Sequence, residues 1–493
     1  MTRQRYRRLI LVVTLTVLSL TAAACGGSQL SPATVRAANQ AMQGQAGGSA
    51  GTGTVPGTGT TPGSSSGPGT GATGTGATGG TTGSGAGAGS GSTGSSSGST
   101  GAAGVNAATG AGHHASCKGF HNSTGITDKT ITVANASDIS GPVPGIFTSA
   151  QQAAKAYIAY FNATSSICGR KLQLLGLDTR TDAGANQQAY EKACHQTFAA
   201  VGSMSAYDSG GASTTQACGL PDIRAMAISD ARNACSTCFG AQATELNSFE
   251  NAVPDFFRKH NHAATQRAAE LYVNAAASVE NAKNQQKVEQ MRGMHFVYSA
   301  SFDVAEFNYG SYVQAMKDKG VRWVQFVGST DEAVRFAQAM QSANFHPDVF
   351  LLDPTSYNPQ FVKTGGSAVD GAYVFIDFTP FEEASHNKEL QLYEQWLQQV
   401  APGSSPTYFG LFAWSATRLF VQQAVALGGK LTRSALVDRI RHVNSWTSNG
   451  LHAPQPVGSK HTSSCWRFIR LQHGRWVPVG GTRYLCHGVT RIG

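Results

Sequence analysis

The sequence predicts an α/β fold made of two doubly wound lobes, each a parallel sheet with helices on both faces. The first observation is that short apolar segments alternate with amphipathic ones from Thr130 onward. Such alternation is typical of parallel sheets with two buried faces. The second is a break in the pattern at residues 245–262. Because one sheet of this many strands would be unusual, we expect a second sheet to begin after that break.

The first unit shows both patterns. Residues 131–136, ITVANA, form a short apolar strand, and a loop with Gly and Pro follows at 138–145. One buried helix face is then predicted by apolar residues at helical spacing: Ala150, Ala153, Ala154, Tyr157, Ile158 and Phe161. Further strands are expected at 172–177, 198–202, 226–229, 294–298, 321–327, 349–352 and 372–376.

Helices are expected between these strands. One example is 331–343, where Ser329 and Glu332 stand at capping-box spacing before an apolar face. In doubly wound sheets, ligands bind beyond the carboxyl ends of the strands. Two facing lobes are therefore expected to form a cleft lined by loops.

The N-terminus has the layout of an export signal. Arg3, Arg5, Arg7 and Arg8 precede an apolar run, 9–25, that is too short for a comfortable membrane span. Residues 25–116 are dominated by Gly, Ser, Thr and Ala, and Arg36 is their only charged residue. This segment lacks the apolar side chains that offset the entropy of ordering a chain, so we expect a disordered tether.

Charge gives no sign of a nucleic-acid partner. The formal net charge is +9, of which four charges belong to the signal arginines, leaving +5 for the rest. Lys and Arg form no run after residue 8.

Nine cysteines are present. Apart from Cys25 there are eight, an even number that predicts four disulfides in an oxidising compartment with 105 possible pairings: Cys117, Cys168, Cys194, Cys218, Cys235, Cys238, Cys465 and Cys486. The CxxC pair Cys235 and Cys238 is either a redox motif, half of a zinc site or a structural bridge, and the absence of a second CxxC favours the bridge. Cys465 and Cys486 flank a predicted hairpin that turns at His473 and Gly474.

The chain carries two resemblances to known proteins. Ala22, Ala23 and Ala24 before Cys25 resemble the lipobox of bacterial lipoproteins, which implies lipidation of Cys25; the alternative is ordinary cleavage after Ala24.

Residues 125–456 resemble the extracytoplasmic solute-binding proteins of the branched-chain amino acid ABC transporter type. The segments that carry this resemblance are TITVANASDISGPVPG, YFNATSSICGRKLQLLGLDTRTDAGANQQAYEKAC, AAVGSMSAYDSGG, GLPDIRAMAIS, FNYGSYVQAMKDKGV and YFGLFAWSATRLFVQQAVALGGKLTRSALVDRI.

The family resemblance implies a type I periplasmic binding protein, a hinged clamp without catalysis or cofactor. We expect a signal peptide at 1–24, the tether at 25–116, an N-lobe at 117–255 and a C-lobe at 256–378. A return segment to the N-lobe is expected at 379–450, and a C-terminal segment with the disulfide-closed hairpin at 451–493. The implied partners are a small solute, an ABC permease and, through Cys25, the lipid bilayer, with the chain a monomer on the extracytoplasmic face of the membrane.

The resemblance also implies ligand-binding positions. Hydroxyls after the third and fourth strands hold the solute in related amino acid binders, and a tyrosine reaches it from the second lobe. Carried over by position, the ligand residues are Ser205, Tyr207, Asp208, Ser209, Ser229, Ala231, Asn233, Tyr309, Asp353 and Tyr357.

Two charges near the cleft depart from the family pattern. Asp230 and Arg232 either pair with each other, or Arg232 faces an anionic solute. An amino acid would also need a carboxylate for its ammonium group, for which Asp208, Asp353 and Asp377 are candidates. The expected solute is a small polar molecule, an amino acid or amide-like, and its identity stays open.

An enzyme is the rival class. Outside the Gly/Ser-rich tether the sequence contains no GxSxG, HExxH or P-loop motif, so we expect no catalytic activity. A sensor of the same fold without transport is the alternative function, and the sequence alone does not separate it from uptake.

Overall fold

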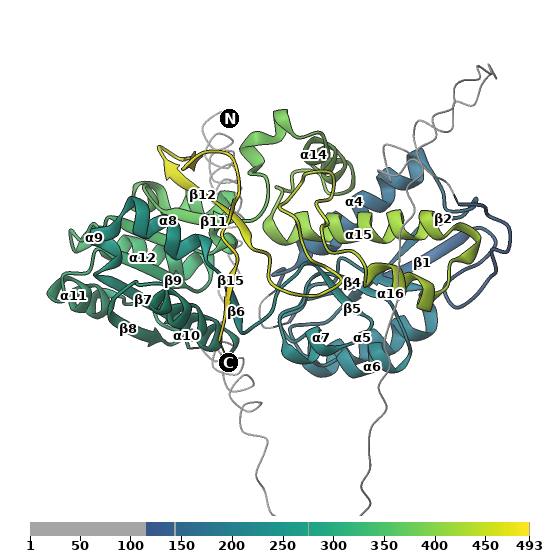
Figure 1. Ribbon diagram of the computed structural model, residues 1–493, viewed down its shortest axis with the longest axis horizontal. Helices are drawn as coiled ribbons and strands as arrows, with labels where there is room; N and C mark the ends of the chain where they lie inside the picture. Colours follow the sequence, from purple (N-terminus) through teal and green to yellow (C-terminus); the bar gives the residue numbers. More distant parts are fainter. Residues whose placement is uncertain (1–114, 142–143, 275, 493) are drawn as a thin grey trace, which may run out of the picture.

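The computed structural model describes residues 115–141, 144–274 and 276–492. Figure 1 shows two lobes side by side, each built around a sheet with helices packed on it. The strands of each sheet are mainly parallel and are separated in the chain by helices. The predicted two-lobed α/β fold is confirmed. The expected signal peptide, the tether and Cys25 lie outside the described residues.

The first lobe contains a five-stranded parallel sheet. Its strands lie in the order β2-β1-β3-β4-β5. Their bounds are β1 Thr130–Ser137, β2 Lys171–Asp178, β3 Ala199–Val201, β4 Asp222–Met226 and β5 Cys238–Gln242. The chain order reverses between β1 and β3, and this is the point at which doubly wound sheets bind ligands.

Helices from both halves of the chain cover this sheet. Helix α4 (Thr148–Thr164) and the long α15 (Tyr408–Leu427) pack together on one face. All six apolar residues that predicted the buried face of α4 are buried. The remaining helices of this lobe are α5 Ala183–Gln196, α6 Ala212–Ala217, α7 Asp230–Ala234, α14 Lys388–Val400, η4 Gly428–Lys430 and α16 Arg433–Ile440.

The second lobe repeats the same strand order and extends it. Five parallel strands lie in the order β8-β7-β9-β10-β11, and β12 and β13 continue the sheet antiparallel. The bounds are β7 Ala268–Val273, β8 Phe296–Phe302, β9 Trp323–Val327, β10 Val349–Leu352, β11 Tyr373–Ile376, β12 Cys465–Gln472 and β13 Arg475–Val479. Both lobes therefore have an equivalent switch point.

Helices also flank the second sheet. Helix α12 (Thr330–Ser342) begins at the predicted capping box, since Ser329 and Glu332 each cap the other's backbone N–H. The other helices are α8 Ala252–His260, α9 His262–Thr265, α10 Ala276–Met291, η1 Pro354–Ser356, α11 Gly310–Asp318, α13 Pro359–Gly365, η2 Gly366–Val369 and η3 Phe381–His386.

The chain passes between the lobes three times. It leaves the first sheet after β5 and enters β6 (Ser248–Glu250), returns after β11 to α14, and crosses again between α16 and β12. The amide of Gln242, the last residue of β5, donates to Asp377, the residue after β11, at 3.0 Å. The carboxyl ends of the two parallel sheets therefore meet at these crossings.

Disulfides and a hairpin fix the periphery. The pairs are Cys117–Cys168, Cys194–Cys218, Cys235–Cys238 and Cys465–Cys486, so the expected four bridges are present. The predicted hairpin is β12–β13, in which His473 and Gly474 have φ of 51° and 75°. Strand β14 (Leu485–Cys486) pairs with β12, and β15 (Val489–Arg491) pairs with β6.

The described chain begins against the far end of α15. The N–H of Gly429 in η4 donates to the Ser116 carbonyl at 2.8 Å. A Cβ atom on Gly429 would stand only 2.0 Å from the Lys118 carbonyl oxygen, so glycine is required for this contact. The start of the folded body is thereby fixed to the first lobe.

Two strand predictions were displaced. The strand expected at 226–229 lies at Asp222–Met226, and the one expected at 294–298 lies at Phe296–Phe302. The first strand was misplaced because it contains two charged residues, Asp222 and Arg224, which are typical of a surface segment. Both are nevertheless fully buried. Strand β7 was not predicted because Glu270 stands in its middle.

Buried carboxylates lie inside the second lobe. Glu270 on β7 accepts a hydrogen bond from Gln325 on β9 at 3.1 Å, and its other oxygen has no partner. Glu289 on α10 accepts from Gln285 at 3.2 Å and also keeps one unpartnered oxygen. Burial raises the pKa of Glu270 to about 8, and it raises the pKa of Glu289 as well. Burial therefore favours the neutral form of both carboxyl groups.

Replacing Glu270 with Gln is expected to reduce the loss of stability that occurs as the pH rises from ~4.3 to about 8. In the unfolded chain this carboxyl titrates near pH ~4.3, so between that pH and about 8 only the folded state holds the proton. The free energy of unfolding then falls as pH rises, by at most ~1.4 kcal/mol per pH unit for one proton. Denaturant titrations across this range should give a flatter profile for E270Q. The exposed Glu280→Gln variant should keep the wild-type profile, and an equal flattening in both would contradict this account.

Candidate functional site

The candidate site is built from loops at the carboxyl edge of the first sheet. Loops after β1, β3 and β4 meet where the strand order reverses. The sequence-predicted residues Ser205, Tyr207, Asp208 and Ser209 follow β3, and Ser229 follows β4. Neighbouring parallel strands bring these residues to one edge, as expected.

Asp138, in the loop after β1, connects this loop to the loops after β2 and β3. Its carboxylate accepts hydrogen bonds from the Ser205 hydroxyl at 3.0 Å, the Ala206 N–H at 2.8 Å and the Thr181 N–H at 3.0 Å. The Thr179 hydroxyl donates to it as well. Asp138 and Ser205 are fully buried, so in this arrangement they support the loops and do not face solvent.

Asp208 has a similar supporting position. Its carboxylate accepts from the Ile228 N–H at 2.9 Å and the Ser229 hydroxyl at 2.5 Å. The Arg224 guanidinium lies 3.7 Å away. Ser229 in turn caps α7 by accepting from the Arg232 N–H at 3.2 Å. Asp208 therefore ties the loop after β3 to the start of α7.

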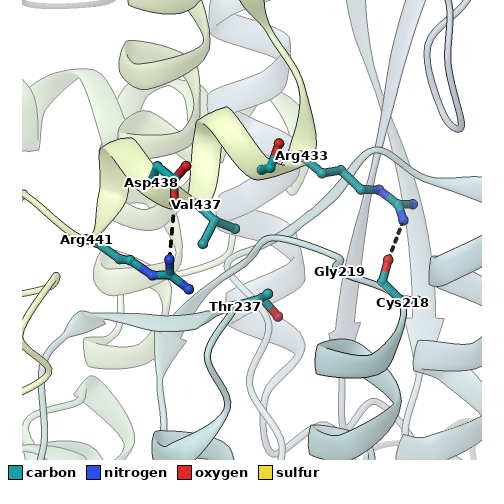
Figure 2. A pocket seen from close by; sticks show the side chains of 8 residues that line it. Cys218, Gly219, Thr237, Arg433, Val437, Asp438 and Arg441 are labelled. Carbon is teal, nitrogen blue, oxygen red and sulfur yellow. Dashed lines mark hydrogen bonds and ion pairs between the residues drawn. The ribbon is translucent and has the colours of Figure 1, made fainter.

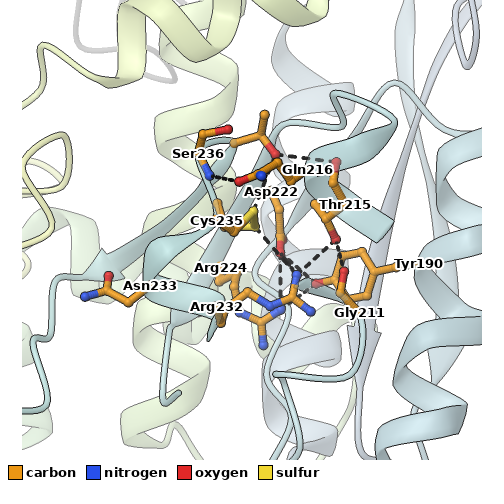
Figure 3. The surroundings of a disulfide bond; sticks show 12 residues. Tyr190, Gly211, Thr215, Gln216, Asp222, Arg224, Arg232, Asn233, Cys235 and Ser236 are labelled. Carbon is orange, nitrogen blue, oxygen red and sulfur yellow. Dashed lines mark hydrogen bonds and ion pairs between the residues drawn. A yellow bond between two sulfur atoms is a disulfide. The ribbon is translucent and has the colours of Figure 1, made fainter. Parts of the chain in front are cut away.

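Arg232 points into the first lobe and away from solvent. Its guanidinium pairs with Asp222 at 3.1 Å, donates to the Asp208 carbonyl at 2.8 Å and lies 4.3 Å from the centre of the Tyr190 ring. Figure 3 shows Arg232 with Asp222 and Tyr190 beside the Cys235–Cys238 bridge. Both sequence-based alternatives for Arg232, a pair with Asp230 and contact with an anionic solute, were wrong, because a buried carboxylate on β4 takes the charge.

The remaining residues of this edge are accessible. Ser209 and Ala231 are exposed, and Tyr207 and Asn233 are half-buried. On the second lobe, Asp353 is half-buried after β10 and accepts from the Thr355 N–H at 2.7 Å. Burial raises the pKa of the Asp353 carboxyl. These side chains leave hydroxyl, amide and carboxylate groups at the interlobe edge.

Two predicted residues lie in the core of the second lobe. Tyr309 is 1% exposed, and its ring packs against Phe302 and Phe336 with centroids 5.3 and 5.8 Å apart. Tyr357 is 3% exposed and stacks on Phe381 at 5.0 Å. The structure does not bring either tyrosine to the accessible edge, because each completes an aromatic cluster.

A pocket of about 410 Å³ lies between the lobes beside the first crossing. Its walls come from α7, α10, the link between β5 and β6 and the C-terminal segment: Asp230, Asn233, Ala234, Glu245, Leu246, Asn247, Glu280, Ser459, Lys460 and His461. The Lys460 ammonium donates to the Asn233 and Cys235 carbonyls at 2.8 and 2.6 Å, and burial lowers its pKa to about 8. Sequence reasoning pointed only to Asp230 and Asn233 here, because the other walls come from distant segments.

A second pocket, of about 430 Å³, lies at the opposite end of the first lobe (Figure 2). Arg433 borders it, and its donors are occupied by main-chain carbonyls, including those of Cys218 at 3.1 Å and Cys194 at 2.8 Å. Arg441 pairs with Asp438 at 3.1 Å. The Arg433 guanidinium is thus largely taken up by the main chain, whereas Arg441 is exposed.

A Ser–His pair is present but closed off. The Ser415 hydroxyl and His452 Nε2 are 2.7 Å apart, and His452 Nδ1 lies 2.8 Å from the Ala453 carbonyl. Ser415 is fully buried, and His452 is 1% exposed. A substrate has no access to this pair in the arrangement seen here.

The two-lobed fold and its interlobe edge define a ligand-binding protein of the periplasmic type. A family model described as periplasmic binding protein matches residues 130–475, and the chain belongs to this family. A comparison with curated protein sequences found no match.

Solved structures with the same fold include three substrate-binding proteins. LivJ from Streptococcus pneumoniae, a branched-chain amino acid transporter substrate-binding protein in complex with isoleucine, is 15% identical, with a TM-score of 0.60 over 72% of this chain and 99% of its own. A branched-chain amino acid ABC transporter protein from Thermus thermophilus with bound valine is 14% identical, with a TM-score of 0.62 over 73% and 97%. A fatty acid ABC transporter substrate-binding protein from Thermomonospora curvata is 15% identical, with a TM-score of 0.61 over 75% and 95%.

Neither a membrane span nor a metal cluster occurs in the part of the chain that the structure describes. Within the described ranges, no helix is both long and apolar enough to cross a bilayer. The same ranges hold no group of three or more His, Cys, Asp or Glu side chains suited to a metal ion.

Replacing Arg232 with Met is expected to lower the free energy of unfolding by about 3–5 kcal/mol, because it removes one partner of a buried ion pair. Denaturant unfolding measures this loss. Arg441→Met is the matched control, since its pair with Asp438 is exposed and such pairs contribute about 0–1 kcal/mol. Equal losses in the two variants would show that the network in Figure 3 has no special weight.

Proposed function

We propose that this protein is a membrane-anchored extracytoplasmic solute-binding protein that captures a small polar solute between its lobes and delivers it to an ABC permease. The observation that carries the proposal is the contact between Gln242 and Asp377 at 3.0 Å. It joins the carboxyl ends of two sheets with the same strand order, so the ligand-binding edge of each lobe is turned toward the other.

The accessible groups support an amino acid or amide-like solute. Ser209 and Asn233 offer a hydroxyl and an amide from the first lobe, and Asp353 offers a carboxylate from the second. Together they match a ligand that both donates and accepts hydrogen bonds. The interlobe pocket of about 410 Å³ falls within the range of ~300–1,000 Å³ that small-molecule sites occupy.

Solute capture would act through the crossings. A molecule that contacts both lobes stabilises the arrangement in which both contacts are made, and it shifts the population toward that form. A permease that recognises this form would then distinguish loaded from empty protein. Ser205 and Asp208 would contribute as supports of the loops, and Tyr309 and Tyr357 as parts of the core.

A panel of solutes is expected to reveal the ligand class by thermal shift on the full chain. Amino acids and short amides should raise the melting temperature, because a ligand that binds only the folded state stabilises it. For the solute that binds, Ser209→Ala and Asn233→Ala should each weaken affinity by about 5-fold or more, which corresponds to the loss of one hydrogen bond of ~1 kcal/mol.

Tyr309→Phe is the control for this experiment. It removes one hydroxyl from the buried core of the second lobe and should leave the ligand-induced shift unchanged. The proposed site would be refuted if Ser209→Ala and Asn233→Ala both bind like wild type while a solute shift is present.

Anchoring through Cys25 has its own test. Mass spectrometry of the membrane-bound protein should find Cys25 as an acylated N-terminus, and Cys25→Ser should release the chain from the membrane fraction. Solute affinity should not change, since Cys25 lies outside the described body. An unmodified cysteine in membrane-associated protein would contradict lipidation.

A further inference from the structure

All three passages between the lobes converge on one buried carboxylate. Asp377 stands at the start of the second crossing, directly after β11. Its Oδ2 accepts hydrogen bonds from the amide of Gln242, at the first crossing, at 3.0 Å and from the amide of Gln455, in the third crossing, at 2.8 Å. One oxygen atom therefore connects the three segments about which the lobes can rotate.

Main-chain contacts reinforce the same point. The Ala453 N–H donates to the Asp377 carbonyl at 2.7 Å, and the Ala243 N–H donates to Gln455 Oε1 at 3.1 Å. The Tyr408 hydroxyl at the start of α15 donates to Gln242 Oε1. We call this polar cluster of Gln242, Asp377, Tyr408 and Gln455 the hinge. Because Asp377 contacts all three crossings, a change in its charge or position affects each of them.

The other oxygen of this carboxylate lacks a partner. Asp377 is fully buried, and its Oδ1 makes no hydrogen bond among the described residues. An ionised carboxylate with one unpartnered buried oxygen is costly, whereas the protonated form carries much less of that cost. A rotation of the lobes that admits water to Oδ1 would remove this desolvation cost. The gain is large only for the ionised carboxylate, because the protonated form carries little of the cost.

We propose that Asp377 is a positioning residue of the hinge, and that its charge couples the arrangement of the two lobes to the pH outside the membrane. Protonation stabilises the arrangement described here. Ionisation favours an arrangement in which Oδ1 is hydrated. The inference concerns the hinge itself and does not depend on which solute the protein binds.

Burial raises the pKa of Asp377 to about 6 in this arrangement, although the two amide donors oppose the rise. A hydrated aspartate titrates near ~3.9, so between these values only the arrangement seen here keeps the proton. Its stability relative to the hydrated arrangement therefore falls as pH rises through that window.

In the arrangement seen here, the neighbouring groups whose pKa is shifted titrate away from pH 6. Burial raises the pKa of Glu250 to about 8 and raises those of Tyr408 and Tyr484. Burial lowers the pKa of His452, beside the third crossing, to about 4. Arg467, opposite Ile376 on β12, is paired with Glu383 at 3.1 Å. Asp377 is therefore the group in this cluster whose charge changes near pH 6.

The test measures the distance between the lobes in the full chain. Spin labels on unnatural amino acids at the exposed positions Lys155 and Lys319 leave the disulfides intact. Pulsed electron resonance should give one distance distribution at about pH 4 and a second population that grows as the pH rises to about 6, with little further change up to about pH 7.5. An unchanged wild-type distribution across this range overturns the proposal, and this arm needs no variant.

Variants then assign the transition. Asp377→Asn should remove it, whereas Glu270→Gln, which removes a buried carboxyl within the second lobe, should leave it in place. A transition that survives Asp377→Asn, or one that Glu270→Gln also removes, overturns the assignment. If Asp377→Asn fails to fold, Asp377→Glu decides the matter, since it keeps a titratable group in a new setting. Its midpoint should move, and an unmoved midpoint counts against Asp377.

Discussion

A carboxylate removed from water must be paired or hydrogen-bonded, and much of the first lobe follows from this requirement. Asp222, the first residue of β4, is fully buried and is balanced by Arg224 and Arg232, at 3.3 and 3.1 Å. Because Arg232 belongs to α7, the pairing fixes that helix against the sheet. Asp208 adds the loop after β3 to the same network through Ser229. The shape of the candidate site is thus set by charges that are fully buried.

The same requirement explains what could be predicted from the sequence. The helix from Thr148 to Thr164, the capping box at Ser329 and the hairpin turn at His473 follow local rules, and local rules are visible in one chain. Strands β4 and β7 follow no such rule, because Asp222 and Glu270 look like surface residues until their partners are known. Those partners lie on other elements, so hydropathy alone misplaces or misses the strands.

In the candidate site, too, the positions of the residues could be predicted from the sequence, but their contacts could not. That Ser205, Asp208 and Ser229 gather at one edge was predictable, since parallel strands align their carboxyl ends. The internal hydrogen bonds of Ser205 and Asp208 could not be predicted, because their partners, Asp138 and Ile228, lie in other loops. Tyr309 shows the reverse case, in which a tyrosine expected to reach the ligand instead completes an aromatic cluster with Phe302 and Phe336.

The way the folded body begins has a geometric consequence. Ser116 is bound to Gly429 beyond the far end of α15, whose first residue, Tyr408, reaches the hinge at Gln242. A helix of 20 residues spans roughly 30 Å, so the chain enters the lobe on the side away from the crossings (Figure 1). A protein anchored by its N-terminus would therefore turn the side opposite the crossings toward the membrane. If Cys25 is the anchor, as we propose, the roughly ninety residues between Cys25 and Ser116 have a contour length that would let the body rotate and turn its interlobe edge toward a membrane partner.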